Sequence, residues 1–188
     1  MKTTQKLIYD NPLACEADIK GFQLEGQTDI SFENGRMRLS SSLPPELEQR
    51  ANYVLWCPEN FPDRIRIEWD FYPLSDRGLC MMFFAAQGQK GEDLFSPVLA
   101  RRTGEYQQYF GGDINTMHLA YYRRRYPSER AFRVCNLRKS YGSHLVAQAG
   151  DPLPPLEDAD SPYHMQIVKD TRHISFVING LLVLQYED

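Results

Sequence analysis

The chain has 188 residues, of which 42% are apolar and 24% charged, and its formal net charge is −4. This length and composition fit one folded domain with its own core and exclude a disordered or collagen-like chain. No apolar run approaches the roughly 18 residues that span a bilayer. The N-terminal segment carries no secretory signal, so we expect a cytoplasmic protein without a membrane partner.

In chain order, the first half predicts strands because apolar residues alternate with a period of two. A hairpin of residues 30–32 and 37–39 turns at Asn34-Gly35, the dipeptide favoured in two-residue turns. A short helix is expected at 44–50, where prolines stand at the first positions. Strands follow at 53–57, 65–71 and 79–86, and the last should be central in its sheet because it is apolar on both faces.

The second half begins with a long excursion at 87–113, and loops of this length inside compact domains are usually functional. The remaining elements are strands at 119–124, 133–138 and 145–148, a proline-rich connector at 151–155, and a three-stranded meander at 166–169, 173–178 and 181–186. Ten or so short strands joined by turns predict an all-β fold, an antiparallel β-sandwich or jelly roll with at most short helices. We expect one domain over residues 1–188.

The four cysteines are far apart in the sequence and form no C-x-x-C pair. They are Cys15, Cys57, Cys80 and Cys135. The last three lie in apolar strand patterns, where a thiol packs as a small hydrophobic group. We therefore expect reduced, mostly buried thiols and no zinc or redox centre. Motifs for nucleotide binding and for serine hydrolases are missing as well.

The segment between His118 and Tyr141 is strongly basic. Its seven Arg and Lys residues and its single acid, Glu129, give it a formal charge of +6, so the rest of the chain carries −10. A local basic segment on an acidic protein predicts a discrete anionic ligand rather than nucleic acid. Arginine forks suit carboxylates and phosphates held in fixed geometry. The alternative is that these side chains are solvated or form internal ion pairs.

The strands of this segment predict a polar face. If neighbours in sequence are neighbours in the sheet, period two turns apolar residues to the core and polar residues to one open face. The residues on this face are His118, Tyr122, Arg124, Asn136, Arg138, His144 and Gln148. Tyr141 lies in the turn between the last two strands, and Tyr106 and Tyr109 of the excursion add aromatic faces.

Proton transfer and anion binding are the chemistry that this set suggests. Imidazoles and phenols transfer protons near neutral pH, so the candidate catalytic residues are His118, Tyr122 and His144. The candidate substrate-binding residues are Arg124, Asn136, Arg138, Tyr141, Gln148, Tyr106 and Tyr109. β-Elimination from a uronic acid needs such groups to neutralise the carboxylate, remove the C5 proton and protonate the leaving oxygen.

A second candidate is a carboxylate pair, Glu68 and Asp70, which period two places on one strand face as a glycosidase requires. The alternative is a solvated face on which Arg66 pairs with one of the two. Asp113 and Asn115 offer oxygen ligands at D-x-N spacing, a weak indication of structural Ca²⁺. We expect no cofactor and no metal centre.

Several runs of residues together resemble the bacterial YesU-type family, a domain of unknown function with a concanavalin A-like lectin/glucanase sandwich. The runs are Ile67 to Leu74, Gly78 to Ala86, Arg102 to Tyr106, Gly112 to Asn115, His118-Leu119, Arg123 to Arg125 and Cys135 to Gly142. The resemblance extends from about Asp63 to the C-terminus. It implies a sugar-associated jelly roll, whose genes in some bacteria accompany pectin utilisation, and it supplies no catalytic residues. The resemblance also implies that family members run on with further closing strands, so we expect this chain either to be truncated or to leave a sheet edge open.

These observations predict a carbohydrate-active β-sandwich that binds or processes an acidic, uronate-containing oligosaccharide. The groove would lie between the open sheet face and the 87–113 excursion, and an enzyme of this kind would act by elimination or hydrolysis. Two alternatives remain open. One is a non-catalytic, lectin-like sugar-binding module, and the other is a scaffold whose basic segment contacts a protein partner. The sequence names neither the sugar linkage nor the oligomeric state.

Overall fold

The computed structural model describes residues 5–188 and divides into two compact units. Unit 1 comprises Met1–Asn60 and Arg101–Gln108, and unit 2 comprises Phe61–Ala100 and Tyr109–Asp188. The predicted single domain over residues 1–188 stays a prediction. Among the helices of residues 5–188, none is long and apolar enough to cross a membrane.

Unit 1 is built from two small antiparallel ribbons. Its strands are β1 (Gln23–Gly26), β2 (Thr28–Glu33), β3 (Arg36–Ser41) and β4 (Tyr53–Trp56), with 3-10 turns at Glu16–Ile19 and Pro45–Ala51. The β2–β3 hairpin is the predicted one, and both turn residues have positive φ, 54° at Asn34 and 69° at Gly35. Strand β1, which the sequence analysis did not predict, pairs with β4.

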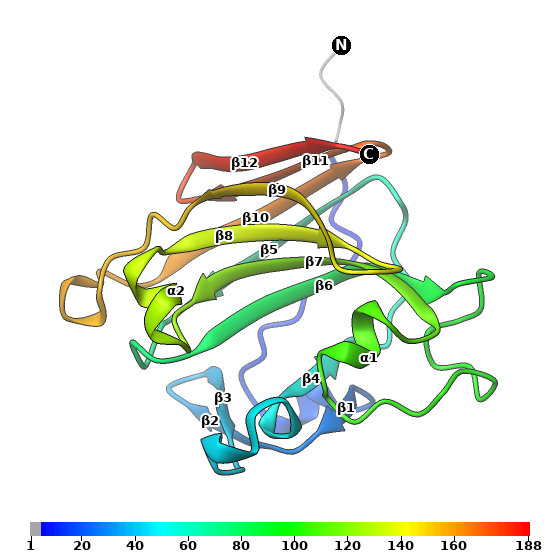
Figure 1. The fold of residues 1–188 in the computed structure, drawn as a ribbon, viewed down its shortest axis with the longest axis horizontal. Coiled ribbons are helices and arrows are strands. Elements are labelled where there is room, and N and C mark those ends of the chain that lie inside the picture. Colours follow the sequence, from blue (N-terminus) through cyan, green and yellow to red (C-terminus); the bar gives the residue numbers. More distant parts are fainter. Residues whose placement is uncertain (1–4) are drawn as a thin grey trace. The chain divides into compact units, whose positions relative to one another are not determined.

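Unit 2 contains two four-stranded antiparallel sheets, seen as a front and a rear layer in Figure 1. One has the order β12-β11-β10-β5, from β5 (Ile65–Phe71), β10 (Tyr163–Asp170), β11 (His173–Ile178) and β12 (Leu181–Glu187). The other has the order β6-β7-β8-β9, from β6 (Leu79–Gly88), β7 (Ile114–Arg123), β8 (Val134–Lys139) and β9 (His144–Gly150). The predicted meander is therefore present as β10–β12, and the antiparallel all-β fold is confirmed.

The core of unit 2 lies between these two sheets. Leu119, Tyr121 and Leu137 of the β6–β9 sheet are in one buried cluster with Ile167 and Phe176 of the other sheet. Burial of each such side chain contributes about 1.5–3 kcal/mol, so this contact surface is the main source of stability for the sandwich. The inward positions on β5 are those that the alternation predicted, since burial falls on every second residue from Ile65 to Phe71.

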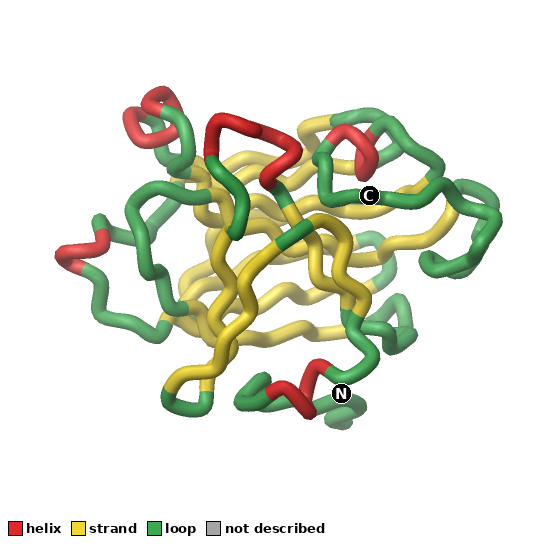
Figure 2. The backbone as a smooth tube through the Cα atoms, turned by 90° about the horizontal axis from the view of Figure 1, so that it is seen from below, coloured by secondary structure: helices red, strands yellow, loops and turns green. Residues whose placement is uncertain are grey.

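Two features of unit 2 differ from the predictions. Strand β6 is at the end of its sheet among the described strands, whereas β7 has neighbours on both sides, so the central placement of residues 79–86 is wrong. Part of the outer face of β6 is apolar because it is covered, as at Phe83, whose ring packs on Tyr109 at a centroid distance of 5.1 Å. The short helices α1 (Gln107–Phe110) and α2 (Pro127–Ala131) were not predicted, and they lie in connections between strands (Figure 2).

None of the four cysteines forms a disulfide. Cys135 is buried, Cys57 and Cys80 are partly buried, and Cys15 is exposed. Burial raises the pKa of the Cys80 and Cys135 thiols to about 12. The two thiols are therefore protonated at neutral pH and act as small core side chains, whereas the prediction of burial fails at Cys15.

Candidate functional site

A β-bulge in β7 decides which side chains reach the outer face of the β6–β9 sheet. Met81 pairs with Ala120 but Cys80 pairs with Tyr122, so Tyr121 is an extra residue in β7. Both Tyr121 and Tyr122 therefore turn inward, and their rings lie 5.2 Å and 5.5 Å from the Phe71 ring. A bulge reverses the alternation that follows it.

The predicted open face is wrong at Tyr122 and Arg124 for this reason. After the bulge, Arg123 turns outward and Arg124 turns inward. Arg123 was not among the predicted site residues, because strict period two assigned it to the core side. Tyr122 is 2% exposed, and its hydroxyl donates to the Ser75 carbonyl at 2.9 Å.

A second bulge moves His144 off the predicted face. Leu137 pairs with Ala147 but Arg138 pairs with Leu145, so Val146 is the extra residue in β9. His144 then stands opposite Lys139, one residue on from Arg138, and belongs to the other side of the sheet. The prediction that His118 and His144 share one face is wrong.

The outer face carries a row of four polar side chains, which we call the polar ladder: Glu129, Arg123, Asn136 and Gln148. Arg123 Nη2 donates to Glu129 Oε1 of α2 at 2.9 Å. With its amide oxygen turned toward Arg123, Asn136 accepts from Arg123 Nη1 at 3.1 Å. The Asn136 amide lies 2.7 Å from the Gln148 amide, but Asn136 is 3% exposed, so its predicted role as a substrate contact is wrong, whereas Gln148 is exposed. The ladder therefore runs from α2 across β7, β8 and β9.

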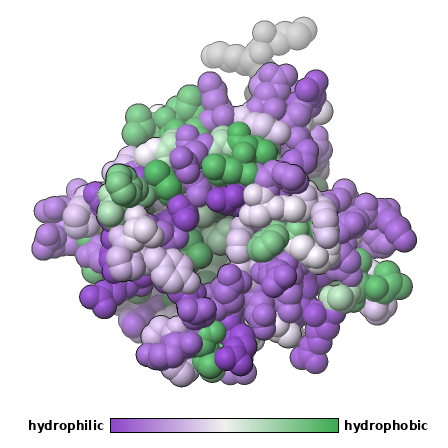
Figure 3. All heavy atoms as spheres, in the orientation of Figure 1, coloured by the Kyte–Doolittle hydropathy of each residue, from purple (hydrophilic) through white to green (hydrophobic). Residues whose placement is uncertain are grey.

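Arg138 and Tyr141 extend this surface beyond the ladder. Arg138 is two residues after Asn136 on β8, about 6.6 Å along the strand on the same face. One guanidinium nitrogen of Arg138 donates to the Ser143 carbonyl at 3.0 Å, and within residues 5–188 Arg138 has no carboxylate partner. Tyr141 is 58% exposed in the β8–β9 turn. Figure 3, which faces this sheet, shows hydrophilic and hydrophobic side chains intermixed.

His118 is on the predicted face but is fully buried there, with 0% exposure. The Ser140 hydroxyl donates to the Tyr109 carbonyl at 2.6 Å, so the His118 Nε2 proton is the one shared with Ser140 Oγ, also at 2.6 Å. Burial, reinforced by the nearby Arg138 charge, lowers the pKa of His118 to about 4. The imidazole is therefore neutral near pH 7 and belongs to an internal network.

The tyrosines predicted from the excursion do not join this surface in the same way. Tyr109 lies in α1, is 1% exposed and packs on Phe83, so its ring is not free for a ligand. Tyr106 belongs to unit 1 and is partly buried. Of the predicted aromatic contacts, Tyr141 is the one whose ring is open to solvent on the β8–β9 turn.

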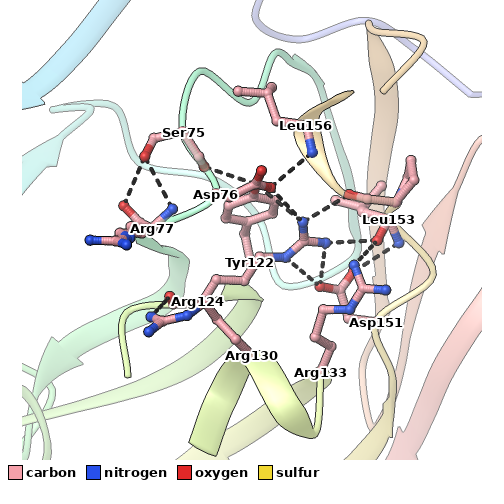
Figure 4. Close-up of polar contacts among 11 residues, drawn as sticks. Ser75, Asp76, Arg77, Tyr122, Arg124, Arg130, Arg133, Asp151, Leu153 and Leu156 are labelled. Carbon is pink, nitrogen blue, oxygen red and sulfur yellow. Dashed lines mark hydrogen bonds and ion pairs between the residues drawn. The ribbon is translucent and has the colours of Figure 1, made fainter. Parts of the chain in front are cut away.

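Arg124 is enclosed in a polar cluster with Tyr122, Asp76 and Asp151, drawn in Figure 4. Its guanidinium is 2% exposed and lies 4.0 Å from the centre of the Tyr122 ring. Nη2 donates to Asp151 Oδ2 at 2.9 Å, and Asp76 Oδ1 is 3.5 Å from Nη1. Arg124 therefore has no free donor face for an external carboxylate.

The same cluster explains the proline-rich connector after β9. Prolines have no N–H group, so a Pro-rich segment cannot pair as a strand of a sheet. Its carbonyl groups then need hydrogen-bond donors from side chains. Arg124 Nη2 donates to the Leu153 carbonyl at 2.7 Å and Nη1 to the Pro154 carbonyl at 2.8 Å. Arg133 donates to Leu153 as well, at 3.0 Å (Figure 4). We assign Arg124 to holding this connector.

The basic segment divides into paired and unpaired charges. Within the described residues, Arg123, Arg124 and Lys139 form ion pairs with carboxylates, those of Glu129, Asp151 and Asp188 among them. Arg130, Arg133 and Arg138 donate to backbone carbonyls, which leaves their charge uncompensated. The expected internal ion pairs and the expected surplus of positive charge are therefore both present.

The alternative carboxylate pair lies on the outer face of the other sheet. Glu68 and Asp70 are both exposed, with Arg66 Nε 3.2 Å from Glu68 and His164 Nδ1 2.9 Å from Asp70. The hydrogen bond to Asp70 raises the pKa of His164. The alternative that Arg66 pairs on a solvated strand face is present in the structure.

The predicted D-x-N pair is used inside unit 2. Asp113 Oδ2 accepts from the Ala100 backbone N–H at 2.6 Å, and Asn115 pairs with Gln87 in the sheet. Over residues 5–188, no group of three or more His, Cys, Asp or Glu side chains is placed to hold a metal ion.

Comparisons with known proteins identify one family and one fold for this chain. The DUF1961 family, described as a domain of unknown function, matches residues 6–188. The uncharacterized protein YesU of Bacillus subtilis (strain 168) is 51% identical over 181 residues, which cover 96% of this chain and 80% of that protein. A crystal structure of a Bacillus subtilis protein of unknown function with a galectin-like fold superposes with a TM-score of 0.90 at 50% identity, covering 96% of this chain and 80% of that one. The resemblance drawn from the sequence and the sandwich fold are both confirmed.

Proposed function

The chain belongs to the DUF1961 family, and we propose that its unit 2 sandwich binds carbohydrate on the outer face of the β6–β9 sheet. The contact surface would consist of Arg138, Tyr141 and Gln148, the exposed end of the polar ladder. The galectin-like fold of the solved relative supports a carbohydrate-binding sandwich. Because one fold hosts many activities, the residues on this face decide what it binds.

The observation that carries the proposal is the arrangement of Arg138. Its charge has no carboxylate partner among residues 5–188, and it stands on the same strand and face as Asn136. A guanidinium in this position binds a carboxylate more strongly than a neutral hydroxyl group. The sugar proposed here is therefore a uronate, with the exposed Gln148 amide contacting its hydroxyls and Tyr141 contacting its ring face.

The geometry favours a binding module over an elimination enzyme. A general base must come within hydrogen-bond reach of the proton that it removes. His118 and Tyr122 are buried and engaged inside the protein, and His144 belongs to the other side of the sheet. The three predicted proton-transfer groups thus do not converge on a common substrate position, which supports the lectin-like alternative.

The test is calorimetric titration of the full chain with trigalacturonate and with a neutral galactose trisaccharide. We expect the acidic ligand to bind and Arg138→Ala to weaken its binding about ten- to a hundredfold, the loss of one charge-assisted hydrogen bond. Tyr141→Ala should weaken the binding of both sugars. Arg66→Ala is the matched control, because it removes a partly exposed arginine from the other sheet. Equal affinity for the two sugars, or an Arg138 variant that binds like wild type, would contradict the proposal.

A further inference from the structure

Unit 1 contains a cleft of about 440 Å³ that no part of the proposed sugar face uses. It is lined by apolar and charged side chains from β1, from the segment between β3 and β4, and from the excursion. Those that matter here are Leu24, Leu43, Arg50, Arg101, Arg102 and Glu105. All of them lie in unit 1, so the cleft is complete within that unit.

The charges in this cleft are of two kinds. Arg102 is structural: it is 9% exposed, and its Nε and Nη2 donate to Glu25 Oε1 at 2.9 Å and 2.8 Å. Arg50 and Arg101 differ, since within residues 5–188 neither guanidinium has a hydrogen bond or an ion pair. The carboxylate of Glu105 is likewise without a partner there. Two arginines and one carboxylate thus line one cleft without neutralising one another.

The backbone of the segment that carries Arg101 and Glu105 is packed tightly against β1 and Asn52. Gly26 and Gly104 have φ values of 91° and 93°, a region that favours glycine. A Cβ at either position would meet the Asn52 carbonyl oxygen, at 2.5 Å from Gly26 and 2.3 Å from Gly104. Thr103 N–H also donates to Gln108 Oε1 at 2.7 Å. The Arg101–Glu105 segment is therefore fixed against β1, and the charged side chains start from a rigid support.

We propose that this cleft binds a second ligand, a hydroxylated ring that carries an oxyanion. Arg50 and Arg101 hold the oxyanion, since guanidinium groups match carboxylate and phosphate geometry. Glu105 accepts hydrogen bonds from ring hydroxyls, and Leu24 and Leu43 contact the apolar C–H face of the ring. Sugar acids and sugar phosphates share this chemistry. The site goes beyond the proposed function, because it is in the other unit and uses none of the same residues.

The experiment is a ligand-observed NMR titration of the full chain with four probes: D-galacturonate, glucose 6-phosphate, D-galactose and inorganic phosphate. We expect one or both of the charged sugars to bind, and whichever binds more tightly names the source of the oxyanion. Galactose and inorganic phosphate should bind at least tenfold more weakly, because each lacks half of the recognised chemistry. Inorganic phosphate that binds as tightly as the tighter of the two charged sugars, or no binding of either charged sugar, would overturn the proposal.

Variants locate the site. Arg50→Ala and Arg101→Ala should each weaken the binding of the charged sugar about tenfold or more. Glu105→Gln should weaken the binding of the sugar but not that of inorganic phosphate. The control is Arg38→Ala, since Arg38 is in the same unit, pairs with Glu33 at 3.3 Å and does not line the cleft. Arg138→Ala removes only the uronate site proposed on the β6–β9 sheet, so binding that depends on Arg50 and Arg101 should persist in this variant. If Arg138→Ala is the one variant that weakens binding of the monosaccharide, the cleft proposal fails and the sheet-face proposal stands.

Discussion

The His118 imidazole shows how burial changes the meaning of a residue that the sequence marks as reactive. Surrounded by Phe83, Tyr109 and Ser140, it has hydrogen-bond partners but no access to solvent. Desolvation disfavours the charged form, which is why its pKa is lowered to about 4. The residue consequently links the pH of the solution to the stability of the fold.

We predict that His118 makes the protein less stable in mild acid. Its pKa is about 4 when folded and near 6.5 when unfolded, so the unfolded state binds more protons between these values. Above pH 6.5, His118 does not reduce the free energy of unfolding. As the pH falls from 6.5 toward 4, the free energy of unfolding drops by on the order of 3 kcal/mol because of this residue. Urea unfolding at pH 7 and pH 4.5 measures it. His118→Gln should show a smaller fall than wild type, and equal falls would contradict the assignment.

Arg124 is the second residue whose environment overrides its apparent role. The Asp151 side chain has 0% exposure, so the pair is buried and each charge depends on the other. Removing one partner of such a pair leaves an uncompensated buried charge.

We therefore expect Arg124→Met to lower the free energy of unfolding by about 3–5 kcal/mol. The double variant with Asp151→Asn should recover part of this loss, because the orphaned carboxylate is gone. Chemical denaturation of the wild type, the two single variants and the double variant gives the interaction free energy between Arg124 and Asp151. Additive losses in the double variant would show that the two side chains do not depend on each other.

At the scale of elements, most strands could be predicted because period two follows from the geometry of a half-buried strand. Residues 65–71 and 173–178 were predicted at their observed bounds. The bulges at Tyr121 and Val146 could not be, since an extra residue depends on how two strands pair and not on the composition of either. Those two residues account for the misplacement of Tyr122, Arg124 and His144.

Helix α2 is the element that a sequence signal could have revealed. Pro127 stands at its first position and Glu129 at its third, which is typical of a helix N-terminus. Glu129 Oε2 accepts from the backbone N–H groups of Arg125 and Tyr126 at 3.0 Å and 3.1 Å, while Oε1 binds Arg123. This carboxylate therefore caps the helix and anchors one end of the polar ladder.

Glu129→Ala should cost about 1–2 kcal/mol of stability, because the cap and the Arg123 pair are lost together. It should also weaken trigalacturonate binding, since Arg123 is no longer held beside Asn136. Thermal unfolding and calorimetry provide the two readouts. Ser128→Ala is the matched control on the same helix, where the hydroxyl has no hydrogen bond in the described part of the chain. An unchanged melting temperature in Glu129→Ala would refute the capping role.

Over the whole molecule, charge is segregated along the chain. The segment from His118 to Tyr141 carries +6 within a protein of net charge −4. Part of this surplus is neutralised by acids such as Glu129, Asp151 and Asp188, and part remains on arginines bonded only to carbonyls. We expect the remaining charge to favour the acidic ligand proposed for the β6–β9 sheet, and calorimetry at rising salt concentration should then show weaker binding.

The central claim is that an acidic saccharide binds on the outer face of the β6–β9 sheet. The most direct measurement is a chemical-shift titration of the isotope-labelled chain with trigalacturonate. We predict that the backbone signals around Asn136, Arg138, Tyr141 and Gln148 shift together and saturate with one dissociation constant. Signals in this group that stay in place while the ligand is in large excess would contradict it, whether or not other parts of the chain respond.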